Sequence, residues 1–373
     1  MLGEIQHHMK ILLLGEYSNL HWTLAEGLRK LGHSVTVVSE GDRFKNYHRD
    51  ITIKRRGEDP FNTIVYVFDL WSKFRTFKGY DVVQLINPIF LQLRPERNLK
   101  VFEYLKKHNK RVYLGAFGDD YYWVKTCLEK KAFRYSDFDM HVHPKMPKIS
   151  MDRMENWVGT IKEEVNKRIA EQCDGIVACL YEYYKSYEDD FKEKLNYIPS
   201  PINIDQIAFK QRGLENEKAK FFIGIQSKRS VGKGTDVMLK VLKEVHAKYS
   251  QESEIMIAED VPFAEYMEMI NRSDILIDQL YSYTPGMNAL SAMAQGMITV
   301  SGAEPEYYDF IGETENKPIV NVLPSEEDIY EKSESLILNR DQLSDVSLKS
   351  REFVEKHHNY INVAQQYLDF WTK

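Results

Sequence analysis

Short apolar runs alternate with helix-like repeats along most of the chain. Residues 10–14 form one apolar run, and residues 35–38 form another. Between them leucines recur at three- and four-residue spacing, at Leu20, Leu24, Leu28 and Leu31. Runs of this length predict buried strands, and that leucine spacing predicts the buried face of a helix. The chain is therefore expected to open with a strand, a helix and a second, parallel strand.

The same alternation continues to the end of the chain. Further strands are predicted at residues 63–68, 81–85, 111–114, 175–179, 220–225, 254–258, 275–277 and 297–301. Helices are predicted at residues 90–107 (with an interruption near Pro95), 151–172, 180–195, 237–249, 263–271, 287–295, 326–338, 342–356 and 363–371. Strands that alternate with helices are typical of parallel sheets, whose ligands bind beyond the carboxyl ends of the strands. The predicted fold class is therefore α/β.

The length of the chain predicts two domains. Its 373 residues exceed what one hydrophobic core usually supports. The phrase YIPSPIN at residues 197–203 contains two prolines that stiffen the backbone, as expected of a hinge. We therefore predict an N-terminal domain at residues 1–202, a C-terminal domain at residues 203–356 and a final helical segment at residues 357–373.

Composition narrows the class of protein. Apolar residues make up 43% of the chain and charged residues 28%, which indicates a globular protein with an ample core. The formal net charge of -6 argues against nucleic acid as a partner. Three cysteines at no metal-binding spacing predict reduced, buried thiols, and no apolar run reaches the ~20 residues of a membrane helix. A cytosolic protein is expected.

One basic cluster leaves contact with a membrane face as an alternative. It contains Lys100, Lys106, Lys107, Lys110 and Arg111 on a predicted helix and the strand after it. The preferred interpretation is a solvated surface, because basic side chains on helices are ordinarily exposed to water. The alternative is a dock for an anionic membrane.

Residues 273–306 predict a seat for a phosphate group. A strand leads through the turn Pro285-Gly286 into a helix that begins at Met287. The first N–H groups of such a helix and the positive end of its dipole attract anions. In the same predicted domain the loop QSKRSVGKGTD contains Lys228, Arg229 and Lys233. These residues are either cations for a phosphate or an ordinary solvated loop, and for phosphate binding Arg229 is preferred to Lys228 because a guanidinium can bind phosphate oxygens in a bidentate manner.

The loops after the N-terminal strands hold the remaining candidates. Gly15 follows the first strand, but the other glycines of a dinucleotide-binding fingerprint are missing, so no nicotinamide cofactor is inferred. Asp119 and Asp120 follow the strand at residues 111–114 and can accept hydrogen bonds from hydroxyl groups of a ligand or act as a base. The alternative is that one of them caps the next helix.

Four residues in alternate positions raise the alternative of a metal site. Asp137, Asp139, His141 and His143 would share one face of an extended segment. The preferred interpretation is a polar loop without a metal.

Several phrases resemble the donor-binding segment of glycosyltransferase family 4, whose members have the GT-B architecture. These are AMAQG at residues 292–296, Gly286, the pair Lys233-Gly234, and GAEPE at residues 302–306. The glutamates that begin and end the E-x7-E motif of the family are replaced by Tyr283 and Ser291, and the histidine of its His-Gly pair by Phe117.

The resemblance implies two Rossmann-like, doubly wound domains that face a cleft. Residues 1–202 would bind the acceptor, residues 203–356 would bind the nucleotide-sugar donor, and residues 357–373 would cross back to the first domain. The implied activity moves a sugar from a nucleoside diphosphate to a lipid-linked or polysaccharide acceptor, with retention at the anomeric carbon and without a required metal or cofactor.

The resemblance also distributes roles over the candidates. Arg229 and Lys233 would hold the diphosphate, and Asp119 and Asp120 would take part in catalysis. The donor would be contacted by Gly15, Val261, Tyr283, Gly286, Met287, Asn288, Ser291 and Glu306. Because the motif glutamates are replaced, two alternatives stay open: a catalytically degenerate partner subunit that binds a nucleotide sugar or glycan, and a sugar-nucleotide epimerase.

Overall fold

The structure is a computed structural model that describes residues 8–42, 45–57, 59–143, 145–213 and 217–373. The chain divides into two compact units. Unit 1 comprises Met1–Lys125, Glu155–Asn203 and Asn359–Lys373, and unit 2 comprises Thr126–Met154 and Ile204–His358. The change at residues 203–204 lies next to the hinge expected from the sequence, whereas residues 126–154, which precede that hinge, pack with unit 2.

Unit 1 is built on a seven-stranded parallel sheet in the order β3-β2-β1-β4-β5-β6-β7. Leu14, at the end of β1, is paired with Val38 on one side and with Leu85 on the other. Residues 11–14 are fully buried, because helices cover both faces of a parallel sheet. The strands are β1 Lys10–Leu14, β2 Ser34–Ser39, β3 Ile51–Thr52, β4 Val82–Leu85, β5 Arg111–Ala116, β6 Gly175–Ala178 and β7 Leu195–Tyr197.

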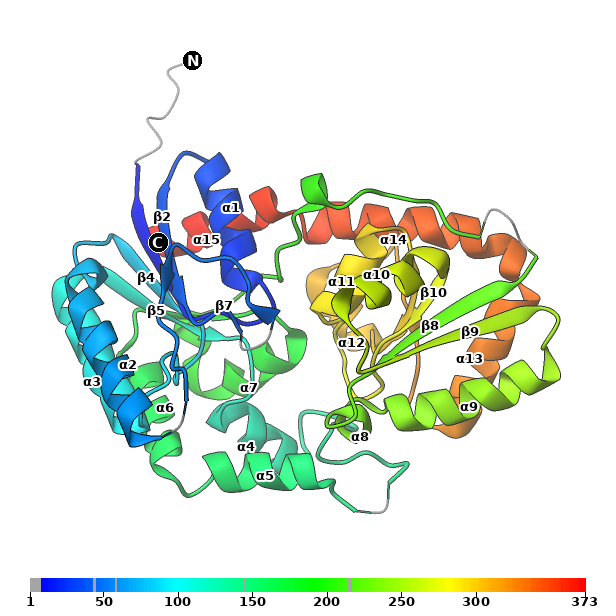
Figure 1. Cartoon of the computed structure of the whole chain (residues 1–373), viewed down its shortest axis with the longest axis horizontal. Coiled ribbons are helices and arrows are strands. Elements are labelled where there is room, and N and C mark those ends of the chain that lie inside the picture. Colours follow the sequence, from blue (N-terminus) through cyan, green and yellow to red (C-terminus); the bar gives the residue numbers. More distant parts are fainter. Residues whose placement is uncertain (1–7, 43–44, 58, 144, 214–216) are drawn as a thin grey trace. The chain divides into compact units, whose positions relative to one another are not determined.

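The helices of unit 1 lie on both sides of its sheet. Figure 1 shows α1 and α15 together on one side and α3 and α6 on the other. A Cβ atom at Gly27 of α1 would lie 2.4 Å from the carbonyl oxygen of Tyr360, so glycine allows α1 and α15 to touch. The helices are α1 Leu20–Lys30, α2 Pro60–Lys73, η2 Phe74–Phe77, α3 Pro95–His108, α6 Ile161–Gln172, α7 Tyr181–Phe191, η3 Lys192–Lys194 and α15 Tyr360–Thr372.

Two helices contain the points where the chain changes unit. They are α4 Tyr121–Glu129 and α5 Lys148–Trp157.

The three cysteines are buried and form no disulfide, as predicted. None of the described helices is long and apolar enough to span a membrane.

Unit 2 is built on a five-stranded parallel sheet in the order β12-β11-β10-β8-β9. The strands are β8 Ala219–Ile225, β9 Ser253–Glu259, β10 Ile275–Ile277, β11 Ile298–Ser301 and β12 Val320–Asn321. The helices are η4 Ile204–Gln206, α8 Ser230–Lys233, α9 Thr235–Lys248, α10 Phe263–Arg272, α11 Met287–Ala294, α12 Pro305–Ile311, α13 Glu326–Leu338, η5 Arg340–Gln342 and α14 Leu343–His357.

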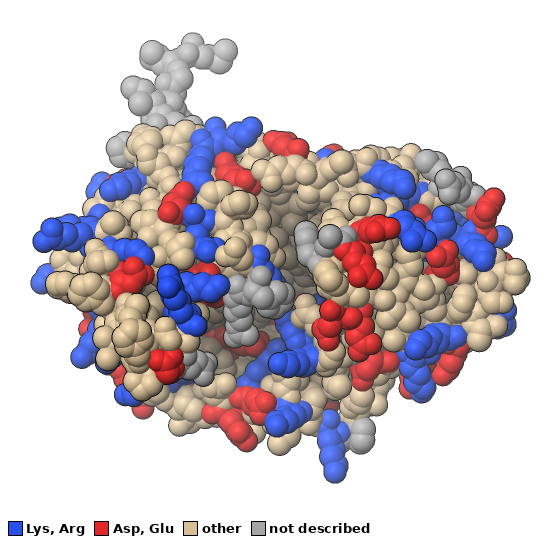
Figure 2. Space-filling view, viewed as in Figure 1, with Lys and Arg blue, Asp and Glu red and all other residues tan. Residues whose placement is uncertain are grey.

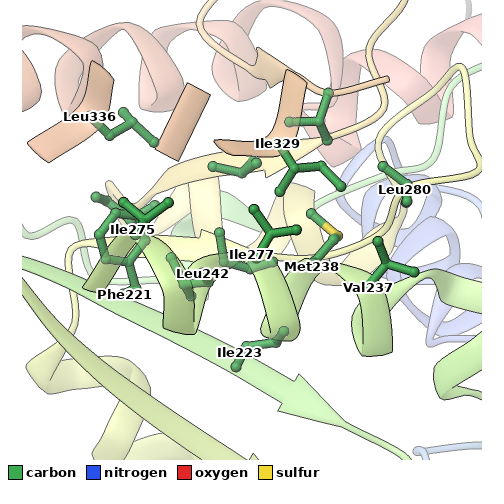
Figure 3. Close-up of a cluster of buried hydrophobic side chains, with 14 of the residues drawn as sticks. Phe221, Ile223, Val237, Met238, Leu242, Ile275, Ile277, Leu280, Ile329 and Leu336 are labelled. Carbon is green, nitrogen blue, oxygen red and sulfur yellow. The ribbon is translucent and has the colours of Figure 1, made fainter. Parts of the chain in front are cut away.

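Successive residues of β8 point to opposite faces of this sheet, which gives unit 2 two apolar clusters. Phe221 and Ile223 belong to one buried cluster with Leu242 of α9 and Leu336 of α13, and Figure 3 shows these side chains. Phe222 points to the other face, where it packs with residues of β10, α10 and α11. The strands are thus held from both sides, and their carboxyl ends present loops in fixed positions.

Two secondary-structure predictions were wrong. Residues 63–68 do not form a strand but lie in the middle of α2, which begins with Pro60 after the cap of Asp59. The run of β-branched and aromatic residues favoured a strand, but the Asp-Pro start signal of a helix prevails. The single helix predicted at residues 151–172 is divided into α5 and α6, because Gly159 has a positive φ of 68° and Thr160 caps α6 by accepting from the N–H of Lys162.

Candidate functional site

The second sheet has a switch point between β8 and β10. The chain goes from β8 to β9 on one side and later returns to β10 and β11 on the other side. The loops that leave β8 and β10 therefore separate, and in parallel sheets ligands bind in the crevice that this separation produces. Here the two loops carry Lys233 and Asp278, respectively.

Lys233 is held rigidly at this switch point. Its carbonyl oxygen accepts a hydrogen bond of 2.8 Å from the N–H of Leu280, in the loop after β10. The next residue, Gly234, has a φ of +74°, and a Cβ atom there would lie 2.5 Å from that of Leu280. Glycine is required at this close approach. The Nζ atom of Lys233 lies 3.7 Å from Oδ1 of Asp278.

Asp278 joins Lys233 to the start of α11. Its side chain is buried, and Oδ1 accepts a 2.9 Å hydrogen bond from Nδ2 of Asn288. The hydroxyl of Tyr266 donates to the other side of Asn288, at 3.2 Å from Oδ1 of the amide. Burial raises the pKa of Tyr266 to about 12, so this hydroxyl keeps its proton at neutral pH.

The second carboxylate oxygen of Asp278 is an acceptor that a ligand can use. Oδ2 is buried and has no hydrogen-bond partner among the described residues. A buried carboxylate oxygen without a donor costs free energy, so a ligand O–H or N–H group that reached it would be bound favourably.

The N-terminus of α11 has no capping side chain. Its N-cap, Gly286, makes no side-chain hydrogen bond to the helix, and the first turn contains no acidic residue. Met287 and Asn288 supply the first helical N–H groups beside the Asp278 network. The positive end of the helix and the ammonium of Lys233 thus belong to the same site.

In unit 1, the N-terminus of α1, the helix that follows β1, already binds a carboxyl group of the protein. Glu16 is buried after β1, and its two carboxylate oxygens accept hydrogen bonds from the N–H groups of His21 and Trp22 at the start of α1. Burial raises the pKa of Glu16 to about 8. Because this carboxyl group already occupies the N-terminus of α1, that helix end is not available to a phosphate group.

Packing alone accounts for Gly15. It has a φ of +92°, and a Cβ atom at this position would lie 2.1 Å from Cγ2 of Ile86.

The carbonyl oxygen of Gly15 is 2.8 Å from Nδ1 of His21. Burial lowers the pKa of His21 to about 4, so the ring is neutral at pH 7. The Nδ1–H group therefore donates to Gly15, and Nε2, which is buried and has no partner among the described residues, is an acceptor.

The two aspartates after β5 have different environments. Asp120 is fully buried: Oδ1 accepts from the N–H of Trp123 at 2.9 Å, and Oδ2 accepts from the hydroxyl of Tyr187 at 2.7 Å. It therefore caps α4, the alternative that the sequence left open. Burial raises its pKa to about 7. Asp119 is half-buried, and its carbonyl oxygen accepts from Nδ2 of Asn87.

Residues 133–135 bind two residues that were predicted to contact the nucleotide-sugar donor, Tyr283 and Glu306. The guanidinium of Arg134 pairs with both Glu304 and Glu306, and its backbone N–H donates to the hydroxyl of Tyr283 at 2.7 Å. The Tyr135 hydroxyl donates to Glu304, and its ring packs against that of Tyr283 at 5.1 Å. Tyr283 and Glu306 thus hold this segment onto unit 2.

The remaining predicted residues surround the switch point less closely. Arg229 is exposed at the start of α8, four positions before Lys233. Val261 follows β9 and packs against the cluster that contains Phe222. Ser291 lies half-buried one turn into α11.

Sequence reasoning missed Tyr266 and Arg134. Tyr266 lies on α10, where one aromatic residue in an amphipathic pattern predicts only packing. The nearest partner of Arg134 in the sequence, Tyr283, is 149 positions away, so no local pattern could indicate either contact.

The alternating acidic and histidine residues do not converge on a metal. Ser136 and Asp139 form a tight backbone turn, and His141 has a φ of +55°, so the segment is not extended as the hypothesis required. Asp137 pairs with Arg153, Asp139 with Lys130, and His143 faces Asp236. Within the described ranges, no group of three His, Cys, Asp or Glu residues could hold a metal ion.

Comparison with known proteins gives likenesses in structure and none in sequence. Neither a protein-family model nor a curated protein sequence matches the chain. Among solved structures, the chain is similar to sucrose-phosphate synthase from Thermosynechococcus elongatus, with a TM-score of 0.61 at 11% identity, over 98% of each chain.

Two further structures are similar over the whole chain. HepE of Anabaena, crystallised with UDP and glucose, has a TM-score of 0.58 at 10% identity, over 98% of this chain and 100% of that one. WaaG, a glycosyltransferase involved in lipopolysaccharide biosynthesis, has a TM-score of 0.54 at 12% identity, over 98% and 100% of the two chains. Together with the two parallel sheets of seven and five strands, these likenesses assign the GT-B fold to the chain.

Proposed function

We propose that the protein is a glycosyltransferase that moves a sugar from a nucleoside diphosphate to a lipid-linked or polysaccharide acceptor. The observation that carries the proposal is the convergence of Lys233, Asn288 and the uncapped N-terminus of α11 at the switch point of the second sheet. In this reaction negative charge builds up on the departing diphosphate. Preorganised positive groups at that position stabilise the transition state.

Arg229 supplies the second cation in this proposal. It is exposed four positions before Lys233, and a guanidinium can bind two phosphate oxygens at once. Two cations and the N–H groups of a helix provide the stabilisation that a divalent metal gives in other enzymes, so we propose a metal-independent reaction. Retention at the anomeric carbon is proposed on the resemblance to family 4.

Asp278 gives the site a place for the sugar or the ribose. Its buried Oδ2 atom can accept from a hydroxyl of the donor, while Oδ1 stays bound to Asn288. Within unit 1, which we propose to bind the acceptor, Asp119 is the carboxylate for catalysis or acceptor binding. Asp120 has a positioning role there, since both of its oxygens are used by Trp123 and Tyr187. The reaction would take place in the cytosol or at the inner face of a membrane.

Turnover of a donor tests the proposal. The protein is incubated with a panel of UDP-, GDP- and CMP-sugars, and thermal stabilisation and slow donor hydrolysis are followed. We expect one donor to stabilise the protein and to be hydrolysed, with both effects lost in Lys233→Met. If no donor stabilises the protein, the proposal is rejected.

A specific observation favours a second candidate, a degenerate protein that binds a nucleotide sugar without turnover. Tyr283 and Glu306, at positions expected to face the donor sugar, are bound by Arg134. Stabilisation by a nucleotide sugar with no hydrolysis and no transfer would support this candidate. Interconversion of donor sugars without an acceptor would instead indicate an epimerase.

A further inference from the structure

One helix of unit 1 exposes its apolar residues to solvent. On α2, Phe61, Ile64, Phe68 and Trp71 have exposed fractions of 72%, 68%, 68% and 71%, and Val65 has 44%. Their spacing of three, four, seven and ten positions puts them along one face of the helix. An exposed apolar face of this kind on a folded protein indicates a binding surface.

The opposite face of α2 is already used by the fold. Tyr66 and Leu70 are buried, and the Tyr66 hydroxyl accepts from the N–H of Gln92. Lys73 binds the carbonyl oxygen of Thr52 and the carboxylate of Asp69. The helix is therefore fixed in this orientation, and the exposed apolar face is not an unpacked part of the core.

The chain around this face is basic, although the whole protein is acidic. Residues 51–80 contain six basic residues (54, 55, 56, 73, 75 and 78) and three acidic residues (58, 59 and 69), a net charge of +3 against -6 for the whole chain. Lys54, Arg56, Arg75 and Lys78 are exposed, and the described part of the chain offers none of them an ion pair. Figure 2 shows the surface over α2 as mostly tan, with both blue Lys and Arg and red Asp and Glu side chains around it.

We propose that α2 docks the protein on an anionic membrane, with Phe61, Phe68 and Trp71 inserted among the lipid headgroups. Helices that bind in the plane of a membrane combine an aromatic or aliphatic face with flanking cations, and tryptophan prefers the boundary between lipid and water. Exposed cations that flank α2 in the sequence, and that have no ion pair with a described residue, favour a lipid surface over a protein partner, because the buried centres of protein interfaces are depleted of lysine. This inference does not depend on the proposed transfer reaction.

Two of the five basic residues in the cluster considered in the sequence for the same role form ion pairs within the protein. Lys106 pairs with Asp174 at 2.6 Å, and Lys110 pairs with Asp81 at 2.6 Å. Arg111 donates to the carbonyl oxygen of Trp371. That cluster also lacks an exposed apolar face, since Phe102 and Leu105 are fully buried. We therefore place the proposed membrane contact at α2 and not at α3.

Trp71 provides a probe at the proposed contact. All five tryptophans lie within the described residues, and Trp71 alone is exposed. Fluorescence of the full chain is measured while phosphatidylcholine vesicles, with or without phosphatidylglycerol, are added. We expect a blue shift with anionic vesicles that is absent in Trp71→Phe, and binding that weakens between about 0.15 M and about 1 M salt as charge is screened.

Matched variants identify the surface. In co-sedimentation with anionic vesicles, Phe68→Ser should weaken binding about tenfold or more, because one large apolar side chain no longer enters the lipid. Leu348→Ser, at an exposed position of α14, should bind like the wild type. Replacing Lys54, Arg56, Arg75 and Lys78 with alanine should remove the preference for anionic vesicles. Thermal unfolding checks that each variant is folded.

Two results would overturn the proposal. One is wild-type protein that does not bind anionic vesicles, or that binds no better than Phe68→Ser. The other is a concentration-dependent dimer that Phe68→Ser abolishes while vesicle binding is absent, which would assign the face of α2 to a second copy of the chain.

Discussion

The ammonium group of Lys233 lies 3.7 Å from Oδ1 of the buried Asp278, and this pair joins the loops that leave β8 and β10. The arrangement has two consequences. The lysine is held at the position that we propose for the diphosphate, and its charge balances a carboxylate that would otherwise be unpaired inside the protein. A single substitution of Lys233 therefore affects both ligand binding and stability, and the two effects have to be separated.

A double substitution separates them. Lys233→Met should lower the free energy of unfolding by about 1–3 kcal/mol, because it leaves the buried carboxylate without its cation. Adding Asp278→Asn should recover most of that loss but none of the nucleotide binding. Urea unfolding and nucleotide titration of both variants check this. Recovery of binding in the double variant would show that Lys233 does not contact the ligand.

Asn288 should matter more than Tyr266, although the two are hydrogen-bonded to each other. Asn288→Ala removes the hydrogen bond to buried Asp278, and we expect a loss of about 1–2 kcal/mol in stability and weaker nucleotide binding. Tyr266→Phe removes only the hydroxyl on the solvent side of the amide, so a loss below about 1 kcal/mol is expected. Thermal unfolding with and without nucleotide measures both, and equal effects would contradict the proposed network.

The ion pairs of Arg134 with Glu304 and Glu306, here called the Arg134 clamp, should hold residues 126–154 against the rest of unit 2. Arg134→Met leaves the buried carboxylate of Glu304 without its cation, and we expect faster proteolysis within this segment and a loss of about 2 kcal/mol in stability. Lys130→Met, which removes an exposed ion pair with Asp139, is the control and should cost less than about 1 kcal/mol. Unchanged proteolysis in Arg134→Met would reject the clamp.

The stability of the protein should fall as the pH rises from about 4 to about 8, because two buried carboxyl groups keep their protons in the folded state after the unfolded chain has released them. The pKa of Glu16 is raised from 4.5 to about 8, and that of Asp120 from 3.8 to about 7. In both cases the folded protein holds a proton that the unfolded chain has already released. Stability is therefore highest below the unfolded values and is lost as the pH rises through the folded ones.

His21 changes the stability of the protein with pH in the opposite direction. Its pKa is lowered from 6.5 to about 4, so its contribution is present above pH 6.5 and is lost on acidification towards pH 4. For the three groups together, urea unfolding at a series of pH values should show a decline of a few kcal/mol between about pH 5 and about pH 8, with little further change above that. Glu16→Gln should flatten the decline, whereas Glu96→Gln, at an exposed position of α3, should leave it unchanged. A decline of equal size in Glu16→Gln would contradict this assignment.

The sequence predicted the sheet-forming parts of the fold because they follow simple patterns. The run at residues 10–14 is fully buried in a parallel sheet, and such strands appear in sequence as uninterrupted apolar stretches. Residues 63–68 have the same appearance but lie in the helix α2. The pattern misled because it assumes that apolar residues are buried, whereas α2 exposes several of them. The same exception that caused the error indicates the docking face.

The candidate site could be predicted only in part. Lys233, Gly286 and Asn288 are close to turns and to a helix start, where local sequence determines geometry. The partners that give these residues their roles come from distant parts of the chain, as Asp278 does for Lys233 and Arg134 does for Glu304. Such pairs depend on the packing of whole elements, which spacing along one sequence does not reveal.

The most direct test of the central claim is a titration that compares nucleoside diphosphates with the corresponding nucleosides. If Lys233, Arg229 and the N-terminus of α11 hold a diphosphate, at least one of UDP, GDP, CDP and ADP should bind, and its nucleoside should bind about a hundredfold more weakly or worse. Lys233→Met/Asp278→Asn, which keeps the stability, should lose that difference. Failure of all four diphosphates to bind, or undiminished binding by the double variant, would contradict the account.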